Sequence, residues 1–442
     1  MNSPSANVPT PDRAVPAYAG AMAIMMGVFF ACGFLTTLND ILVPHLKSLF
    51  TLNYFQVMFV QFSFFSAFFV FSMPSGKLVG LLGFKKAIVI GLLTMAAGAF
   101  LFLPAAAVPS FPLFMLALTV LAAGDTCLQV SGNPYVLALG NPRTGSSRLN
   151  LTQAFNTVGS TVAPFFGGWF IFRNLPKPLD EVQHLSASAL RAYRLHEAAS
   201  VKMPYFCIAL SLLTIALAVT LRKMPAGGKA PDAREIQPGF FSGVWRNRHV
   251  VLGAIGIFVY VGAEITIGSF LVNYFGQPYI AGLNMRDAAG YVTLYWAGAM
   301  IGRFVGSAVL RKVTTSTALA ISACIAFLLV FTSICSSGLL AMWSIILVGF
   351  FNSIMFPGLF ALGIENLGPM TGKASGILMA AAVGGAIIPV LQGALADAIG
   401  IHLSFIVPAL CYIYVAFYSF SRSKAKPAEY ATLTVSGQSL SS

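Results

Sequence analysis

Charge is what this sequence has least of. Only 9% of its 442 residues are Asp, Glu, Lys or Arg, while 57% are hydrophobic. Soluble domains carry about 25% charged residues. A soluble core does not need this much apolar sequence, so the composition excludes an ordinary soluble domain. It predicts an all-α polytopic membrane protein. The 41 Gly and 24 Pro agree, because both residues are more frequent in membrane helices than in soluble ones.

Cysteine and histidine are also few, and neither forms the pattern of a site. The six Cys lie in or beside apolar runs without a CxxC pair, which gives no sign of a disulfide framework or a zinc site. The five His show no HExxH spacing. The segment 368–373 is one residue short of a phosphate loop and has no Ser or Thr after its Lys. We therefore expect no enzyme, no cofactor, no metal and no nucleotide partner.

The basic residues are distributed in a way that orients the chain. The net charge is +13, but the Lys and Arg sit in short loops between apolar runs, which requires no nucleic-acid partner. If the N-terminus is cytoplasmic, 19 of the 26 Lys and Arg lie on the cytoplasmic side. Cytoplasmic loops carry the excess of basic residues. We expect a multi-pass protein of the cell inner membrane with both termini in the cytoplasm.

Apolar runs long enough to cross a bilayer recur along the whole chain. A membrane helix needs about 20 mainly apolar residues. Twelve runs qualify: 19–46, 56–82, 86–105, 110–140, 148–172, 203–221, 249–275, 288–310, 316–336, 339–365, 373–398 and 402–421. The predicted domains are a disordered cytoplasmic tail (1–18), a six-helix half (19–221), a basic cytoplasmic linker (222–248), a second six-helix half (249–421) and a cytoplasmic C-terminal tail (422–442). The polar segment 173–202 is predicted to form an external helix or a lid.

The two halves repeat each other. Gly76, Lys77, Gly80, Lys85 and Lys86 return as Gly302, Arg303, Gly306, Arg311 and Lys312, at a constant offset of 226. Further echoes link 133–140 to 356–363 and 163–168 to 388–393. Two parallel six-helix halves are a recurring transporter plan, with the site near the midplane between them. The repeats therefore predict two pseudo-symmetric halves around a central site.

Several stretches resemble a known family of transporters. They are 33–44, 128–136 (LQVSGNPYV), 148–156 (RLNLTQAFN) and 260–264 (YVGAE). In these residues the chain resembles the major facilitator superfamily, and more narrowly its fucose–galactose–glucose:proton symporter family. The resemblance covers about 19–421 and implies a twelve-helix fold that imports a sugar together with a proton.

The chain departs from the family pattern at two positions. Gly80 stands where the superfamily loop usually has an Asp, and Gly306 repeats the absence. Gln129 stands where fucose-type members have a Glu, as in the glucose and galactose branch. A two-carboxylate proton relay therefore does not carry over directly, although Asp125 supplies an acid one turn earlier.

Polar residues inside the apolar runs are the candidate sugar site. Amide side chains both donate and accept hydrogen bonds, as sugar hydroxyls do. Asp125, Gln129 and Asn133 are spaced i, i+4, i+8 and so share one helical face. The predicted substrate-binding residues are Asn39, Gln129, Asn133, Gln153, Asn156, Glu264, Asn273, Asn352 and Gln392. The alternative for each amide is a bond that only joins neighbouring helices, at about 0.6–2 kcal/mol.

Asp40 is the main candidate for ion coupling. It lies inside the first apolar run, beside Asn39 and one turn before Pro44. A carboxylate at the centre of a membrane helix costs about 3 kcal/mol on insertion scales, and such groups usually face a cavity and move protons or ions. Asp125 is the second candidate; its alternative role is structural. The residues do not separate H⁺ from Na⁺.

The sequence therefore predicts a secondary active transporter that imports a hexose by proton symport through alternating access. The other readings of the same residues are a sodium-coupled sugar symporter, a facilitator or antiporter of another metabolite, and a sugar sensor that does not transport. The expected partners are a small sugar and the lipid bilayer, and we expect a monomer.

Overall fold

The chain is helical throughout the residues that the computed structural model describes, which are 11–50, 54–170, 186–199, 201–222, 225 and 247–423. Ten helical segments in these ranges are long and apolar enough to cross a membrane. One of them, Ser66–Ala107, is long enough for two crossings, and α4 (Gly145–Phe170) is a further helix of 26 residues. The predicted set of twelve membrane helices fits this arrangement.

The N-terminal half contains α1 (Pro11–Phe50), α2 (Tyr54–Ala107), α3 (Phe111–Ala138), α4, α6 (Ala187–Ala199) and α7 (Lys202–Leu221). Two of the predicted spans lie within α2, which breaks at Gly83. Gly83 has φ 79° and ψ 168°, a conformation that glycine adopts without steric cost. Lys85, just after the break, donates to the Thr220 and Arg222 carbonyls at 2.9 and 3.0 Å and so holds the break against the end of α7.

The C-terminal half contains α9 (Arg248–Phe275), α10 (Met285–Val309), α11 (Thr315–Cys335), α12 (Gly338–Asn352), α13 (Met355–Gly363), α14 (Thr371–Ala380), α15 (Gly384–Ile399), α16 (Ile401–Ser404) and α17 (Ile406–Ser423). Two predicted spans are broken helices. Span 339–365 divides into α12 and α13, and span 373–398 divides into α14 and α15 around a 3-10 turn at Ala381–Val383. Broken helices at membrane depth recur at transporter binding sites.

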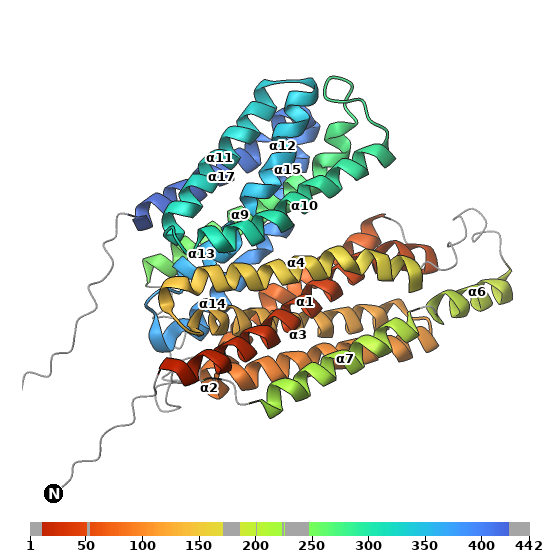
Figure 1. Cartoon of the computed structure of the whole chain (residues 1–442). Helices are drawn as coiled ribbons and strands as arrows, with labels where there is room; N and C mark the ends of the chain where they lie inside the picture. Colours follow the sequence, from red (N-terminus) through yellow and green to blue (C-terminus); the bar gives the residue numbers. More distant parts are fainter. Residues whose placement is uncertain are drawn as a thin grey trace, which may run out of the picture.

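The two halves meet at one end of the molecule and diverge toward the other (Figure 1). They meet near α13 and α14, where α2 packs on α14 and α4 packs on α10. Near this end the basic residues Lys85 and Lys86 follow the break in α2, Arg143 lies in the turn between α3 and α4, Arg311 and Lys312 follow α10, and Lys373 lies in the first turn of α14. We call it the basic end. Contacts between the two halves therefore close the space between them at the basic end.

Much of the predicted tails and of the predicted linker lies outside the described residues. Helix α1 begins at Pro11, within the range predicted as a tail. Most of the linker 222–248, residues 424–442 of the C-terminal tail, and residues 171–185 of the polar segment are outside the described part of the chain. Within that segment, residues 187–199 form α6, which lies at the end away from the basic end (Figure 1).

Candidate functional site between the two halves

Helices α4 and α10 are joined across the interface by a ladder of polar contacts. Their polar residues recur every three or four positions, so each set lies on one helical face. Near the basic end, Ser147 donates to the Ser307 carbonyl at 2.6 Å and Ser307 donates to the Ser147 carbonyl at 3.0 Å. One turn further in, the Asn150 amide donates to the Arg303 carbonyl at 2.6 Å.

Helices α2 and α14 approach each other through glycine. A Cβ at Gly76 would lie 2.7 Å from the Gly372 carbonyl oxygen, and a Cβ at Gly376 would lie 2.7 Å from the Ser72 carbonyl oxygen. Real Cβ atoms do not approach backbone oxygens this closely, so glycine is required for the contact. Ser375, beside Gly376, donates to the Val130 carbonyl of α3 at 2.6 Å. The halves are therefore in backbone contact here.

A row of three amides lies directly behind these contacts. The Asn133 amide donates to Gln129 Oε1 at 3.3 Å, and Gln153 Nε2 donates to Asn133 Oδ1 at 3.1 Å. All three side chains are buried. The Asn133 amide also contacts the Met379 sulfur of α14, 3.7 Å away. The structure thus brings Gln129, Asn133 and Gln153 into one chain of hydrogen bonds that reaches the opposite half.

Asp125 continues this row along α3. Its side chain is only 2% exposed, and it hydrogen-bonds with the Cys32 thiol of α1 and with Gln129. Its Oδ1 atom is buried without a hydrogen-bond partner. Buried polar atoms are almost always paired, so an unpaired carboxyl oxygen marks a place where a proton, water or ligand belongs.

The C-terminal half presents Glu264 and Arg303. Glu264 is 9% exposed, and its Oε1 atom has no hydrogen-bond partner. Its carboxyl group lies close to the Tyr260 hydroxyl and to the Arg303 guanidinium. The Arg303 guanidinium reaches into the other half, where Nη1 donates to the Gln153 carbonyl at 3.1 Å and to the Thr157 hydroxyl. A carboxylate and a cation thus flank the amide row.

Asn352 is the centre of a different network. It is fully buried at the end of α12, where the helix breaks. Its amide donates to the Tyr295 hydroxyl at 2.9 Å, and its Oδ1 accepts from the Tyr412 hydroxyl at 2.8 Å. Its carbonyl accepts from the Tyr260 hydroxyl at 2.9 Å. These bonds occupy both ends of the Asn352 side chain, so in this conformation it braces the broken helix.

The other predicted residues are more dispersed. Asn156 donates to the Phe29 carbonyl of α1 at 3.1 Å, within the N-terminal half. Gln392 is buried and donates to Ser404 at 3.2 Å, within the C-terminal half. Asn273 is exposed in the last turn of α9. Asn39 and Asp40 belong to α1, but their side chains lie outside what the structure describes.

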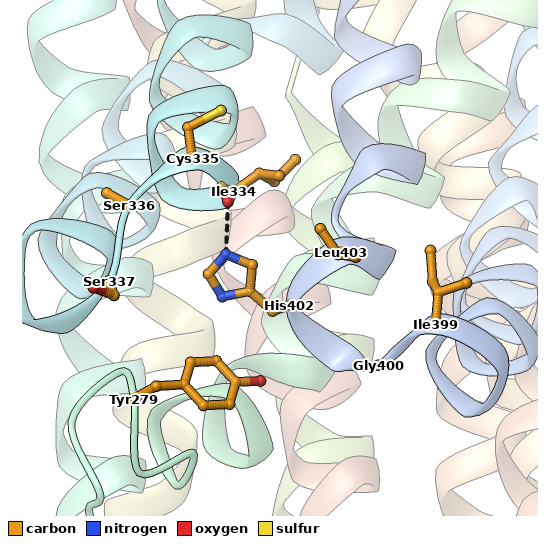
Figure 2. Close-up of a pocket in the computed structure, with 9 residues that line it drawn as sticks. All are labelled: Tyr279, Ile334, Cys335, Ser336, Ser337, Ile399, Gly400, His402 and Leu403. Carbon is orange, nitrogen blue, oxygen red and sulfur yellow. Dashed lines mark hydrogen bonds between the residues drawn. The ribbon is translucent and has the colours of Figure 1, made fainter.

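A surface hollow of about 500 Å³ lies elsewhere, at the outer end of the C-terminal half. Figure 2 shows that His402 and Tyr279 line it together with the turn after α11. His402 Nε2 is 2.7 Å from the Ile334 carbonyl, to which it must donate because a carbonyl only accepts. None of the predicted site residues is among those lining this hollow.

The site residues predicted from the sequence do not include Tyr260, Tyr295, Tyr412 or Cys32. Their positions relative to polar residues could have indicated some of them. Tyr260 precedes Glu264 by one turn, and Cys32 precedes Asp40 by two. In the sequence Arg303 stands out only as a member of the repeat at an offset of 226. The structure shows its side chain crossing between the halves.

Two helical bundles that enclose buried polar residues at their interface are the plan of many secondary membrane transporters. Residues 24–382 match the family model of the Major Facilitator Superfamily, and the chain belongs to this superfamily. It is a multi-pass membrane transporter and not an enzyme.

Named relatives extend the match over nearly the whole chain. A glucose/galactose transporter of Brucella abortus is 48% identical over 412 residues, 92% of this chain and 95% of the relative. An L-fucose-proton symporter of Escherichia coli is 34% identical over 413 residues, 92% of this chain and 94% of that one. The crystal structure of FucP, a superfamily transporter in the outward conformation, superposes with a TM-score of 0.86 at 34% identity, covering 92% of this chain and 100% of FucP.

Proposed function

We propose that this chain is a sugar transporter that imports a hexose of the glucose, galactose or fucose type by proton symport. The observation that carries the proposal is the buried row of Gln129, Asn133 and Gln153 at the interface between the halves. Amides suit the mixed donors and acceptors of a sugar. The names of the relatives, glucose/galactose transporter and L-fucose-proton symporter, support the same substrate class and, at the family level, coupling to a proton.

In this proposal the sugar binds between the halves, above the contacts of the basic end. Gln129, Asn133 and Gln153 face it from the N-terminal half, and Glu264 faces it from the C-terminal half. Asn39 and Asn156 extend the site on the side of α1. Asn352 supports the C-terminal wall through its tyrosine partners. Gln392 is bonded to Ser404 and Asn273 is exposed in the last turn of α9, so we expect these two residues to contribute least to sugar affinity.

Asp40 and Asp125 are the proposed proton carriers. Burial penalises the charged form of a carboxyl group, and a carrier must exist in both protonation states during the cycle. Asp125 has an unpaired oxygen and adjoins Gln129, so a proton there would alter the amide row directly. We propose that Asp40 loads the proton and that Asp125 senses it beside the sugar.

The basic end is proposed to face the cytoplasm, because cytoplasmic loops carry the excess of Lys and Arg. Both termini then lie inside the cell. With contacts between the halves concentrated at the basic end, the described conformation corresponds to one open to the outside, like the outward conformation in which FucP was crystallised. Rocking of the halves around the amide row would expose the sugar to the cytoplasm.

Uptake into proteoliposomes tests the proposal. Radiolabelled glucose, galactose and fucose are offered with a pH gradient or a sodium gradient imposed separately. The native chain should accumulate one of them when the inside is alkaline, and Asp40→Asn should lose accumulation while keeping sugar exchange. Asp397→Asn is the matched control, because Asp397 is exposed near the end of α15. Uptake driven by the sodium gradient alone would identify Na⁺ as the coupling ion instead of the proton. If neither gradient drove the uptake of any of the three sugars, hexose symport would be refuted.

A further inference from the structure

Arg303 ties the two halves together at the depth of the amide row. Its guanidinium donates to the Gln153 carbonyl at 3.1 Å and to the Thr157 hydroxyl, both on α4. Its own carbonyl accepts from Asn150, again on α4, at 2.6 Å. One residue on α10 therefore makes three contacts with the opposite half. All three must break when the halves separate at the basic end.

The same guanidinium has a potential partner within its own half. Glu264 lies on α9, which packs against α10, and its carboxyl group is close enough to Arg303 for the two charges to interact. Among the described residues, no hydrogen bond or ion pair joins the two side chains in this conformation. Instead, Glu264 Oε1 is a buried acceptor without a partner and Arg303 Nε is a buried donor without one. The two unpaired atoms are complementary, and both belong to the C-terminal half.

Breaking the contacts with α4 would leave a charged donor group in a membrane interior. An unpaired buried charge is strongly unfavourable, because nothing then offsets the loss of its hydration. The penalty is avoided if the guanidinium moves to a carboxylate nearby. A rotation about the bonds of the Arg303 side chain requires no change of the backbone, so Glu264 is the acceptor that this geometry offers.

We propose that Arg303 is a positioning residue that exchanges partners during transport. It bonds α4 while the basic end is closed and pairs with Glu264 when the basic end is open. A sugar hydroxyl bonded to Glu264 would compete with this pairing, so the occupancy of the site would bias the exchange. The substrate part of this statement rests on the proposed function, but the exchange itself does not.

Distances between spin labels test the exchange without sugar. The labels are placed on exposed residues of the two halves, in a chain whose accessible Cys207, Cys324 and Cys335 are replaced by serine. Arg143→Cys with Lys312→Cys reports the basic end. Val108→Cys with Leu339→Cys reports the opposite end, where these side chains are 67% and 64% exposed. Opening of the basic end lengthens the first distance and shortens the second.

Substitutions of Arg303 and of Glu264 should shift the two spin-label distances in opposite directions. Arg303→Gln removes the charged hydrogen bonds to α4 and should lower the population of the closed state relative to the open state by about tenfold. Both spin-label distances should therefore shift toward the values of an open basic end. Glu264→Gln removes the negative charge that competes for the guanidinium and should shift both distances toward a closed basic end. Arg303→Lys keeps a charged donor and should restore part of the closed population. Arg311→Gln, an exposed arginine just beyond α10, should leave both distances unchanged.

Coupling between the two residues distinguishes exchange from separate structural effects. In the Arg303→Gln background, Glu264→Gln should cause no further shift, because the partner of the carboxylate is gone. Shifts of both single variants in the same direction, or unchanged distances in monodisperse Arg303→Gln protein, would overturn the proposal. The spin-label distances are measured without sugar, so they test the exchange separately from sugar transport. If the distances shift as expected but the native chain takes up no hexose, symport is refuted and the exchange of partners still holds.

Discussion

Ser147 and Ser307 exchange hydrogen bonds across the interface between the two halves. Each hydroxyl donates to the backbone carbonyl of the other residue, at 2.6 and 3.0 Å, and the two hydroxyl oxygens are 3.2 Å apart. Both residues are buried. A reciprocal pair of this kind forms only while α4 and α10 are in contact. It therefore marks the closed state of the basic end.

The double variant Ser147→Cys/Ser307→Cys should form a disulfide that locks this state. The two serine oxygens are 3.2 Å apart, so cysteine sulfurs in their place would start close to the S–S bonding distance of about 2 Å. Oxidation should stop net sugar uptake, and a reductant should restore it. Uptake is measured before and after each treatment in proteoliposomes. Each single variant treated in the same way is the control, and an oxidised double variant that still transports at the native rate would contradict rocking at this interface.

Asn133→Leu should weaken both the amide row and sugar binding. The substitution leaves Gln129 Oε1 without its donor and Gln153 Nε2 without its acceptor, at about 1–3 kcal/mol for each unpaired group. Thermal unfolding in detergent should shift to lower temperature, and hexose affinity should fall by about tenfold or more. Asn273→Leu, at an exposed position, should change neither quantity. If both variants changed the hexose affinity equally, the amide row would not be the sugar-binding site.

Asp125→Asn should uncouple transport from the pH gradient. The amide keeps the shape of the side chain and its contacts with Cys32 and Gln129, but it cannot carry a proton. Accumulation driven by an alkaline interior should fall to the level of vesicles without a gradient, while sugar counterflow continues. Both are measured in one preparation. Unaltered accumulation would assign Asp125 a structural role and leave coupling to Asp40.

Gly376→Ala should favour an open basic end. The added Cβ would lie 2.7 Å from the Ser72 carbonyl oxygen, so α2 and α14 must separate or strain, at about 1–3 kcal/mol. A reporter cysteine at Ser147, which is 3% exposed, should then react faster with a thiol reagent. Gly290→Ala is the matched control, since its Cβ would have nothing within 4 Å. Identical reaction rates in the two variants would show that this contact does not restrain opening.

The membrane helices and their pairing into halves follow from local pattern. Apolar runs of bilayer length and the repeat at an offset of 226 predict twelve helices in two bundles, and the described helices and the superfamily match agree with that prediction. The i, i+4, i+8 spacing of Asp125, Gln129 and Asn133 places them on one face of α3. These features depend on residues close in sequence, so the sequence by itself determines them.

Only the tertiary structure decided which polar groups meet. Gln153 bonds Asn133 from 20 residues away, whereas Arg303 reaches Gln153 from 150 residues away. Among the predicted site residues, Asn352 proves to be engaged by tyrosines on three other helices, which no periodicity in the sequence could indicate. The same holds for the unpaired oxygens of Asp125 and Glu264. A hydrogen bond depends on the distance between two atoms, and packing of whole helices sets that distance.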